Sequence, residues 1–260
     1  MRTPRGAAPT GYSSFTVGNA LVVALTPLAN AIREALAAGT LYDYAARHPA
    51  ARRYAGRGVV YAAPLPSSEA VVVVRRSRHG GLFAPLTGDR FSRGTRAPRE
   101  LRIALRLAAL GVPTPQLVAY ATYPAGLGLR RADVLTREVP NAADLATRLT
   151  RRPEASARAV LFGAAESLLA QLSRAGVRHP DLNLKNVLIA EHTGDGGLEP
   201  FVLDVDRIRF DTPGARAVTD ANLRRFARSA RKWRESHGAP ISDLDLALLA
   251  DRVRASLVVR

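Results

Sequence analysis

The segment HPDLNLKN, residues 179–186, constrains this 260-residue chain more than any other feature. It follows a long stretch of helical pattern. Two short apolar runs come after it, Val187–Ala190 and Pro200–Leu203, separated by a turn-rich stretch that contains Gly-Asp-Gly-Gly. This order predicts a helix, a polar loop and a β-hairpin in succession. Asp204 stands at the far end of that hairpin, in the sequence Leu-Asp-Val-Asp, and this context argues against an ordinary polar loop.

The residue types in this region match the needs of phosphoryl transfer. Asp181 can accept a hydrogen bond from an attacking hydroxyl, so we expect it to be the catalytic base. Asn186 and Asp204 are oxygen ligands suited to Mg²⁺, which neutralises charge on the phosphates of ATP. His179 could act as a base as well, or it could hold the loop by hydrogen bonds.

The apolar patterns predict an α+β fold with two lobes. The first half is rich in strands with one main helix, and the second half is mostly helical with one hairpin. We expect a leader at residues 1–54, an N-lobe at 55–138 and a C-lobe at 139–260. Strands are expected at Phe15–Leu25, Gly58–Pro64, Ala70–Arg76, Gln116–Thr122 and Asp133–Glu138, and helices at Leu28–Tyr44, Arg99–Leu110, Ala142–Leu149, Ala155–Ala175, 219–235 and 243–257.

The N-terminal half offers groups for a nucleotide. Gly56 and Gly58 lie before a strand, where glycine lets backbone N–H groups approach phosphates. The strand of four valines ends in Arg75 and Arg76, and side chains alternate along a strand, so only one of them can face a given side. We expect Arg75 to fill the phosphate-binding role, with Arg76 as the alternative. Glu100 lies on the apolar side of the next helix and is the expected partner of that arginine, although it could instead cap the helix.

Together these motifs resemble the bacterial lipopolysaccharide kinases of the protein-kinase-like superfamily, especially those that act on 3-deoxy-D-manno-octulosonic acid (Kdo). The resemblance covers roughly residues 55–235 and includes Gly-Arg-Gly, Val-Val-Arg-Arg-Ser-Arg-His-Gly-Gly-Leu, Arg-Glu-Leu-Arg, Gly-Val-Pro-Thr-Pro and His-x-Asp-Leu-Asn-x-x-Asn with Asp-x-Asp. It implies a base at Asp181, metal ligands at Asn186 and Asp204, and nucleotide-binding groups at Gly56, Gly58, Arg75, Glu100 and Lys185.

The resemblance also implies a reaction and a place for it. The γ-phosphate of ATP would pass, with Mg²⁺, to a hydroxyl of Kdo on a lipid A precursor at the cytoplasmic face of the inner membrane. Another core sugar such as heptose stays open as the acceptor.

Two positions depart from the general kinase pattern. Arginine replaces the usual lysine at 75, and Asp206 replaces a glycine, where it could contact a second metal or hold the loop. The short remaining chain argues against a protein substrate.

The net charge of the chain limits the classes of molecule that it is expected to bind. The formal net charge is +16, and all of the 38 cationic side chains except Lys185 and Lys232 are arginines. Such a protein attracts polyanions, which suits an anionic glycolipid in an anionic membrane and disfavours the cationic acceptors of aminoglycoside or choline phosphotransferases. Aromatic content of 6% and the lack of a recognised motif argue against specific nucleic-acid binding. A non-catalytic nucleotide-binding scaffold is favoured only by the missing lysine.

Three further expectations come from what the sequence lacks. It contains no cysteine, which excludes disulfides and thiolate metal sites. Its most apolar early stretch, Ala20–Ile32, is interrupted by Pro27 and Asn30 and is shorter than the roughly 20 residues of a spanning helix. We therefore expect a cytoplasmic protein that touches the membrane peripherally, and no protein partner is evident.

Overall fold

The computed structural model describes residues 8–37, 39–54, 58–77, 89–92, 94–192 and 197–257. Its contacts divide the chain into two compact units, residues 1–101 with 116–138 and residues 102–115 with 139–260. The assignment of 55–138 and 139–260 as kinase lobes stays a prediction. Within the described ranges, no helix is both long and apolar enough to cross a membrane.

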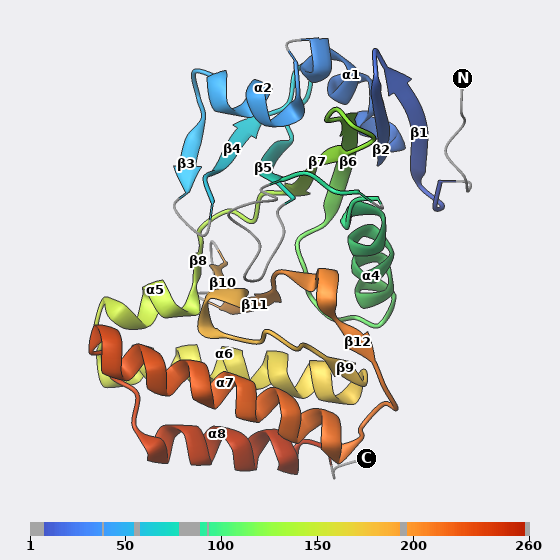
Figure 1. Ribbon diagram of the computed structural model, residues 1–260. Coiled ribbons are helices and arrows are strands. Elements are labelled where there is room, and N and C mark those ends of the chain that lie inside the picture. The colour runs from blue at the N-terminus through green and yellow to red at the C-terminus, as the bar shows by residue number, and fades with distance from the viewer. Residues whose placement is uncertain are drawn as a thin grey trace. The chain divides into compact units, whose positions relative to one another are not determined.

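The first unit is built on a seven-stranded antiparallel sheet with the order β1-β2-β6-β7-β5-β4-β3 (Figure 1). Its strands are β1 (Tyr12–Val17), β2 (Ala20–Leu25), β3 (Arg52–Tyr54), β4 (Val60–Pro64), β5 (Val71–Arg76), β6 (Leu117–Pro124) and β7 (Arg130–Arg137). The strands predicted between residues 58 and 138 are present, and β3 was not predicted.

The segment expected as a leader belongs to this sheet. The single strand predicted at Phe15–Leu25 is wrong: the chain turns at Gly18-Asn19, so β1 and β2 form a hairpin in which Val17 pairs with Ala20. Gly18 has a φ of 55°, which glycine adopts without the penalty of a side chain. A Gly-Asn pair between apolar runs is a hairpin signal that could have revealed the turn. β2 then pairs with β6, which joins the early segment to the rest of the sheet.

Two helices pack on one face of the sheet. They are α1 (Ala29–Ala37) and α2 (Leu41–Arg47), preceded by the 3-10 turn η1 (Thr26–Leu28). Ile32 of α1 and Leu41 of α2 are fully buried together with Val72 and Val74 of β5. Successive side chains of β5 point to opposite faces of the sheet. Val72, Val74 and Arg76 therefore face these helices. Val71, Val73 and Arg75 face the opposite side.

The helix predicted at Leu28–Tyr44 is in fact two helices. Gly39 has a φ of 123°, and Thr40 adopts an extended conformation and caps α2, with its hydroxyl accepting a hydrogen bond from the Asp43 N–H at 3.1 Å. A glycine followed by threonine and then, three residues after it, aspartate is a common stop and start signal. The boundary between the two helices was therefore indicated by the sequence. It was missed because the helical spacing of apolar residues continues across Gly39 and Thr40.

The second unit combines helices with small sheets. Its elements are α5 (Leu145–Thr150), α6 (Ala155–Arg174), α7 (Arg216–His237), α8 (Asp243–Ala255), the 3-10 turns η2 (Leu184–Asn186) and η3 (Val205–Arg207), and the strands β8 (Ala142–Asp144), β9 (Val177–Arg178), β10 (Val187–Glu191), β11 (Leu198–Val202) and β12 (Arg209–Phe210). A further helix, α4 (Ala97–Ala109), begins in the first unit and continues in the second. The predicted hairpin is β10 and β11.

One helix prediction in this unit needs correction. Residues 142–149 were expected to be helical throughout, but β8 pairs with β10, with Ala143 opposite Ile189, before α5 begins. The Asp144 carboxylate caps α5 by accepting the Thr147 N–H at 2.9 Å. Alanine favours helices, so local propensity misled the prediction, and pairing with a strand more than 40 residues away overrode it.

The helices α6, α7 and α8 lie alongside one another in the lower part of Figure 1. Gly176, just after α6, has a φ of 66°, and a side-chain carbon there would lie 2.4 Å from the Asp211 carbonyl oxygen. Only glycine fits this approach, which lets β9 pair with β12. β9 leads directly into the segment 179–186.

Candidate active site

The loop after β9 is organised around the buried imidazole of His179. Its Nδ1 accepts a hydrogen bond from the Asp181 N–H at 3.2 Å. The other ring nitrogen, Nε2, must then carry the proton and donate to the Leu203 carbonyl at 2.9 Å. Burial is the main cause that lowers the pKa of His179, which keeps the ring neutral. These contacts agree with the alternative in which His179 holds the loop.

The backbone of His179 is fixed by a residue far along the chain. Asn222 of α7 accepts the His179 N–H at 3.0 Å and donates through Nδ2 to the Val177 carbonyl at 2.8 Å. Asn222 is almost completely buried. One amide side chain thus satisfies a buried donor and a buried acceptor at the entry to the loop.

Asn183 and Asn186 fix the second half of the loop. The Asn183 side-chain oxygen accepts the backbone N–H groups of Lys185 and Asn186 at 3.0 and 3.2 Å, which caps η2. The side-chain nitrogens of Asn183 and Asn186 both donate to the Asp181 carbonyl, at 3.0 and 2.8 Å. Because its nitrogen is held there, Asn186 has its amide oxygen left as the atom that could bind a cation.

Asp204 is positioned by the same network. The Leu203 N–H donates to the Asn186 carbonyl at 2.9 Å, while the Leu203 carbonyl accepts from His179. Asp204 itself is exposed and has a left-handed backbone with φ 56° and ψ 50°, which is uncommon for a residue other than glycine. Strained backbone of this kind concentrates at functional sites. Asp206, two residues on, is buried.

The donor set fits a hard cation. Asn186 and Asp204 offer an amide oxygen and a carboxylate, and Mg²⁺ is often held by one or two such groups while phosphates and water complete its shell. Among the described residues no cluster of three or more histidine, cysteine, aspartate or glutamate side chains could hold a metal by itself.

The first unit contains the predicted pairing of Arg75 with Glu100. The Arg75 guanidinium contacts the Glu100 carboxylate, which lies in the first turn of α4 and is 5% exposed. A carboxylate so buried needs a cation beside it. The ion pair is thus present as expected, and the role of both residues toward a nucleotide stays a prediction.

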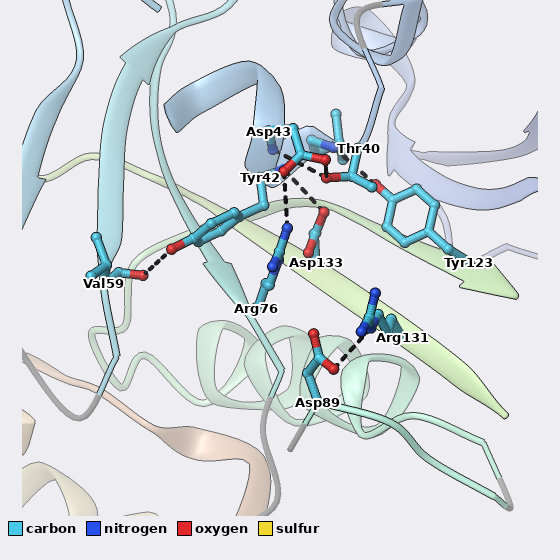
Figure 2. A network of polar contacts seen from close by, with 10 residues as sticks. Thr40, Tyr42, Asp43, Val59, Arg76, Asp89, Tyr123, Arg131 and Asp133 are labelled. Atoms are coloured by element: carbon cyan, nitrogen blue, oxygen red, sulfur yellow. Dashed lines mark hydrogen bonds and ion pairs between the residues drawn. The ribbon is translucent and has the colours of Figure 1, made fainter. Parts of the chain in front are cut away.

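Arg76 is engaged on the other face of β5, as Figure 2 shows. Its Nη2 donates to the Asp43 carboxylate at 2.9 Å, and its guanidinium carbon lies 4.2 Å from the centre of the Tyr42 ring. Asp133 of β7 lies beside this pair and accepts the Tyr42 N–H at 3.0 Å. The structure therefore commits Arg76 to α2 and leaves Arg75 as the arginine on the Glu100 side.

The Arg76 contacts belong to a polar network that sequence reasoning missed. Burial raises the pKa of Asp133 to about 6, although the Tyr42 N–H, the Tyr123 hydroxyl and Arg76 all favour its ionised form. The Tyr123 hydroxyl accepts the Leu41 N–H at 3.0 Å. With Thr40, these groups satisfy the first three N–H groups of α2. The contacts join positions 82 and 91 apart, so no local pattern could indicate them.

The remaining predicted residues are placed differently. Gly56 lies outside the described residues, and Gly58 lies two residues before β4. Lys185 is exposed, and its ammonium lies 5.3 Å from the centre of the Trp233 ring on α7, a distance typical of a cation–π contact. The role expected for Lys185 toward the phosphates of a nucleotide stays a prediction.

These features define a protein-kinase-like fold, and comparison with known proteins identifies the family. WaaP, solved in complex with acyl carrier protein, aligns with a TM-score of 0.52 and 16% identity over 83% of this chain and 82% of that one. The model of the lipopolysaccharide kinase (Kdo/WaaP) family matches residues 53–245. The chain therefore belongs to the lipopolysaccharide kinase (Kdo/WaaP) family.

Curated relatives agree with this assignment. A 3-deoxy-D-manno-octulosonic acid kinase of Vibrio parahaemolyticus serotype O3:K6 is 30% identical over 200 residues, which is 75% of this chain and 79% of the relative. A kinase of the same name from Xanthomonas oryzae pv. oryzae is 30% identical and covers 73% of each chain. The sequence-based predictions of the fold class, the family and phosphotransferase activity are confirmed.

Proposed function

We propose that this kinase transfers the γ-phosphate of ATP to a hydroxyl of Kdo on a lipid A precursor. The likeness to relatives named as kinases of that sugar supports the choice of acceptor. The observation that carries the chemistry is the hydrogen-bond network of His179, which joins the backbone of Asp181 to the Leu203–Asp204 segment. A kinase requires its base and its metal ligands to be held in fixed relation, and this network supplies that constraint.

Each residue has a distinct role in this proposal. The Asp181 carboxylate accepts the hydrogen bond of the attacking sugar hydroxyl and orients it. Asn186 and Asp204 hold Mg²⁺, which neutralises phosphate charge when it is bound. Arg75 binds the nucleotide phosphates in place of the usual kinase lysine. Glu100 limits the freedom of Arg75 by pairing with it.

Gly56, Gly58 and Lys185 complete the proposed nucleotide-binding groups. Backbone N–H groups at the two glycines would approach the phosphates, because glycine imposes no side chain there. For Lys185 the proposal requires the ammonium to leave the Trp233 ring when ATP binds, since the two are in contact in the structure. Asp206 lies buried beside the metal ligand Asp204, and we assign it to holding the loop.

The place of the reaction follows from its acceptor. A lipid-linked sugar is held in a membrane, and the net charge of +16 attracts an anionic surface. We therefore propose peripheral contact with the cytoplasmic face of the inner membrane. The acyl carrier protein belongs to the WaaP complex. At 16% identity that likeness supports the fold alone, so the proposal includes no protein partner.

The test is transfer of radiolabelled γ-phosphate from ATP, with Mg²⁺, to a Kdo-bearing lipid A precursor and, in parallel, to a heptosylated core. We expect label on the first acceptor, and loss of label by a factor of order 10² or more in Asp181→Ala. Asp211→Ala, which removes an exposed carboxylate elsewhere in the same unit, is the matched control and should transfer normally. Chelation of Mg²⁺ should also abolish transfer.

Three other outcomes would change the proposal. Label only on the heptosylated core would keep the family and replace the sugar. Full transfer by Asp181→Ala would show that the base is another residue. ATP binding without transfer to either acceptor would favour a nucleotide-binding scaffold.

A further inference from the structure

Helix α7 presents two chemically different sides. One side is buried in the second unit through residues such as Val218, Leu223 and Phe226. The opposite side is exposed and carries Arg224, Arg225, Arg228 and Lys232, which we call the basic face of α7. Steps of four residues place three of these cations next to one another along the helix, and the fourth lies beside them.

The charges of the basic face are not neutralised by neighbouring acids. Within the described ranges, none of its four cations has a carboxylate oxygen within ion-pair distance. Other cations of α7 differ: Arg216 pairs with Asp220 at 3.7 Å, and Arg231 and Arg234 pair with Asp243 at 2.9 and 3.0 Å.

Like charges four residues apart destabilise a helix by a few tenths of a kcal/mol per pair. The helix carries this cost on its exposed side, although Asp220 and Asp243 pair with other cations of the same helix. Such an arrangement is expected where an external anion neutralises the face.

We propose that the basic face of α7 docks on an anionic phospholipid surface. Long arginine and lysine side chains reach lipid phosphates without requiring a particular geometry, and each cation near such a surface strengthens binding by about fivefold. The exposed side between Arg224 and Lys232 contains no aromatic residue, so it offers no stacking platform for a nucleic acid. The choice of lipid rests on the proposed function, because the proposed acceptor is itself embedded in a membrane.

The same helix holds the catalytic loop on its inner side. Asn222 accepts the His179 N–H, the Ser229 hydroxyl accepts the Leu184 N–H at 3.1 Å, and Trp233 contacts Lys185. α7 therefore links the lipid surface to the loop that carries Asp181. The separation is set by the thickness of one helix, about 10 Å. Docking through this face would keep the proposed base at a constant depth relative to lipid-linked sugars.

The experiment measures flotation of the purified protein with vesicles of phosphatidylcholine, with and without phosphatidylglycerol. The test variant is Arg224→Gln/Arg225→Gln/Arg228→Gln/Lys232→Gln. We expect the unaltered protein to bind only the anionic vesicles, and the variant to bind them roughly 10²- to 10³-fold more weakly. All four positions are exposed, so the thermal midpoint of the variant should match that of the unaltered protein.

A matched control separates this face from net charge. The variant Arg47→Gln/Arg53→Gln/Arg99→Gln/Arg102→Gln also removes four exposed arginines, none of which forms an ion pair among the described residues. It should bind anionic vesicles within about threefold of the unaltered protein, since these side chains lie on other elements. Equal loss in both variants would overturn the inference, because charge alone would then explain binding.

Three further outcomes decide the inference. Failure of the unaltered protein to bind anionic vesicles would overturn it. Loss of duplex DNA binding in the α7 variant, with vesicle binding intact, would overturn it in favour of a nucleic acid. Normal phosphorylation of a detergent-dispersed acceptor by the α7 variant, together with lost vesicle binding, would support it. Vesicle binding needs neither ATP nor acceptor, so a failure of the proposed function is seen separately.

Discussion

Two polar networks, one in each unit, are built from different chemistry. In the first unit, Arg76 and Asp133 form a charged network around the start of α2 (Figure 2). In the second unit, His179 and Asn222 form a neutral network of imidazole, amides and backbone groups. Burial raises the pKa of Asp133 in the charged network to about 6, whereas burial lowers the pKa of His179 in the neutral network and favours the uncharged ring. The loop with the proposed base is thus held by contacts that do not compete with phosphate or Mg²⁺ for charge.

The largest expected effect is on the neutral network. Asn222→Ala should lower the free energy of unfolding by about 3 kcal/mol or more, because it leaves the His179 N–H and the Val177 carbonyl buried without partners. Tyr123→Phe in the charged network removes the acceptor of one N–H and should cost about 1–2 kcal/mol. Denaturant unfolding measures both. Equal costs would show that the two networks do not differ in this way.

A second prediction concerns the charged network and pH. The pKa of Asp133 is raised from 3.8 to about 6, so its folded state binds the proton more tightly than its unfolded state. This group therefore adds stability below about pH 4, which is lost as pH rises through about 6, and amounts to about 3 kcal/mol. Asp133→Asn should remove that part of the pH dependence. Unfolding midpoints measured between about pH 4 and 7 for both proteins provide the check; parallel curves would contradict the assignment.

A third prediction separates the adjacent arginines. Arg75→Met should lower kcat/KM for ATP by about tenfold or more, whereas Arg76→Met should leave that constant nearly unchanged and lower stability by about 1 kcal/mol. Arg75→Lys, which keeps the cation beside Glu100, is the control for the buried charge left by methionine. Steady-state kinetics and thermal unfolding together give the answer. If only Arg76→Met impairs use of ATP, the two roles must be exchanged.

The smallest expected effect concerns His179, whose contribution to stability changes with pH in the direction opposite to that of Asp133. Burial lowers the pKa of His179 below 6.5. Its contribution to the free energy of unfolding is therefore full above that pH, and it is lost as the pH falls because the unfolded chain then takes up a proton. At one pH unit below 6.5, the loss of stability is up to about 1.4 kcal/mol. The substitution His179→Gln should abolish this loss. Unfolding at about pH 7.5 and 5.5 tests this. A loss of stability in acid that persists in the variant would have to come from other groups.

Sequence alone predicted the parts of the site whose chemistry is local. The spacing of Asp181 and Asn186, and the position of Asp204 after a hairpin, are properties of one short stretch. The pairing of Arg75 with Glu100 was accessible because strand and helix periods indicate which side each residue faces. No local pattern could reveal that Asp133 accepts the Tyr42 N–H or that Asn222 accepts the His179 N–H, because the partners in each pair are more than 40 residues apart.

The errors in secondary structure have two different origins. Ala142–Asp144 has a helical composition and becomes a strand only because β10 has an edge to pair with. The turn at Gly18-Asn19 was overlooked because the flanking residues read as one apolar run. Long-range pairing therefore decided the first case, whereas a local turn signal was available in the second.

The register of β5 sets how tolerant this region is to insertions and deletions. Both edges of the strand are paired, since Val74 lies opposite Tyr61 of β4 and Leu135 of β7. Loss or gain of one residue within Val72–Val74 would turn every later side chain to the other face, and Arg75 and Arg76 would exchange environments. The turn at 66–69 lies beyond the Leu65 N–H, which donates to the Ala70 carbonyl at 2.9 Å, and it could change length without that exchange. Length variation among functional homologues should therefore occur in the turn, and the strand itself should keep its length.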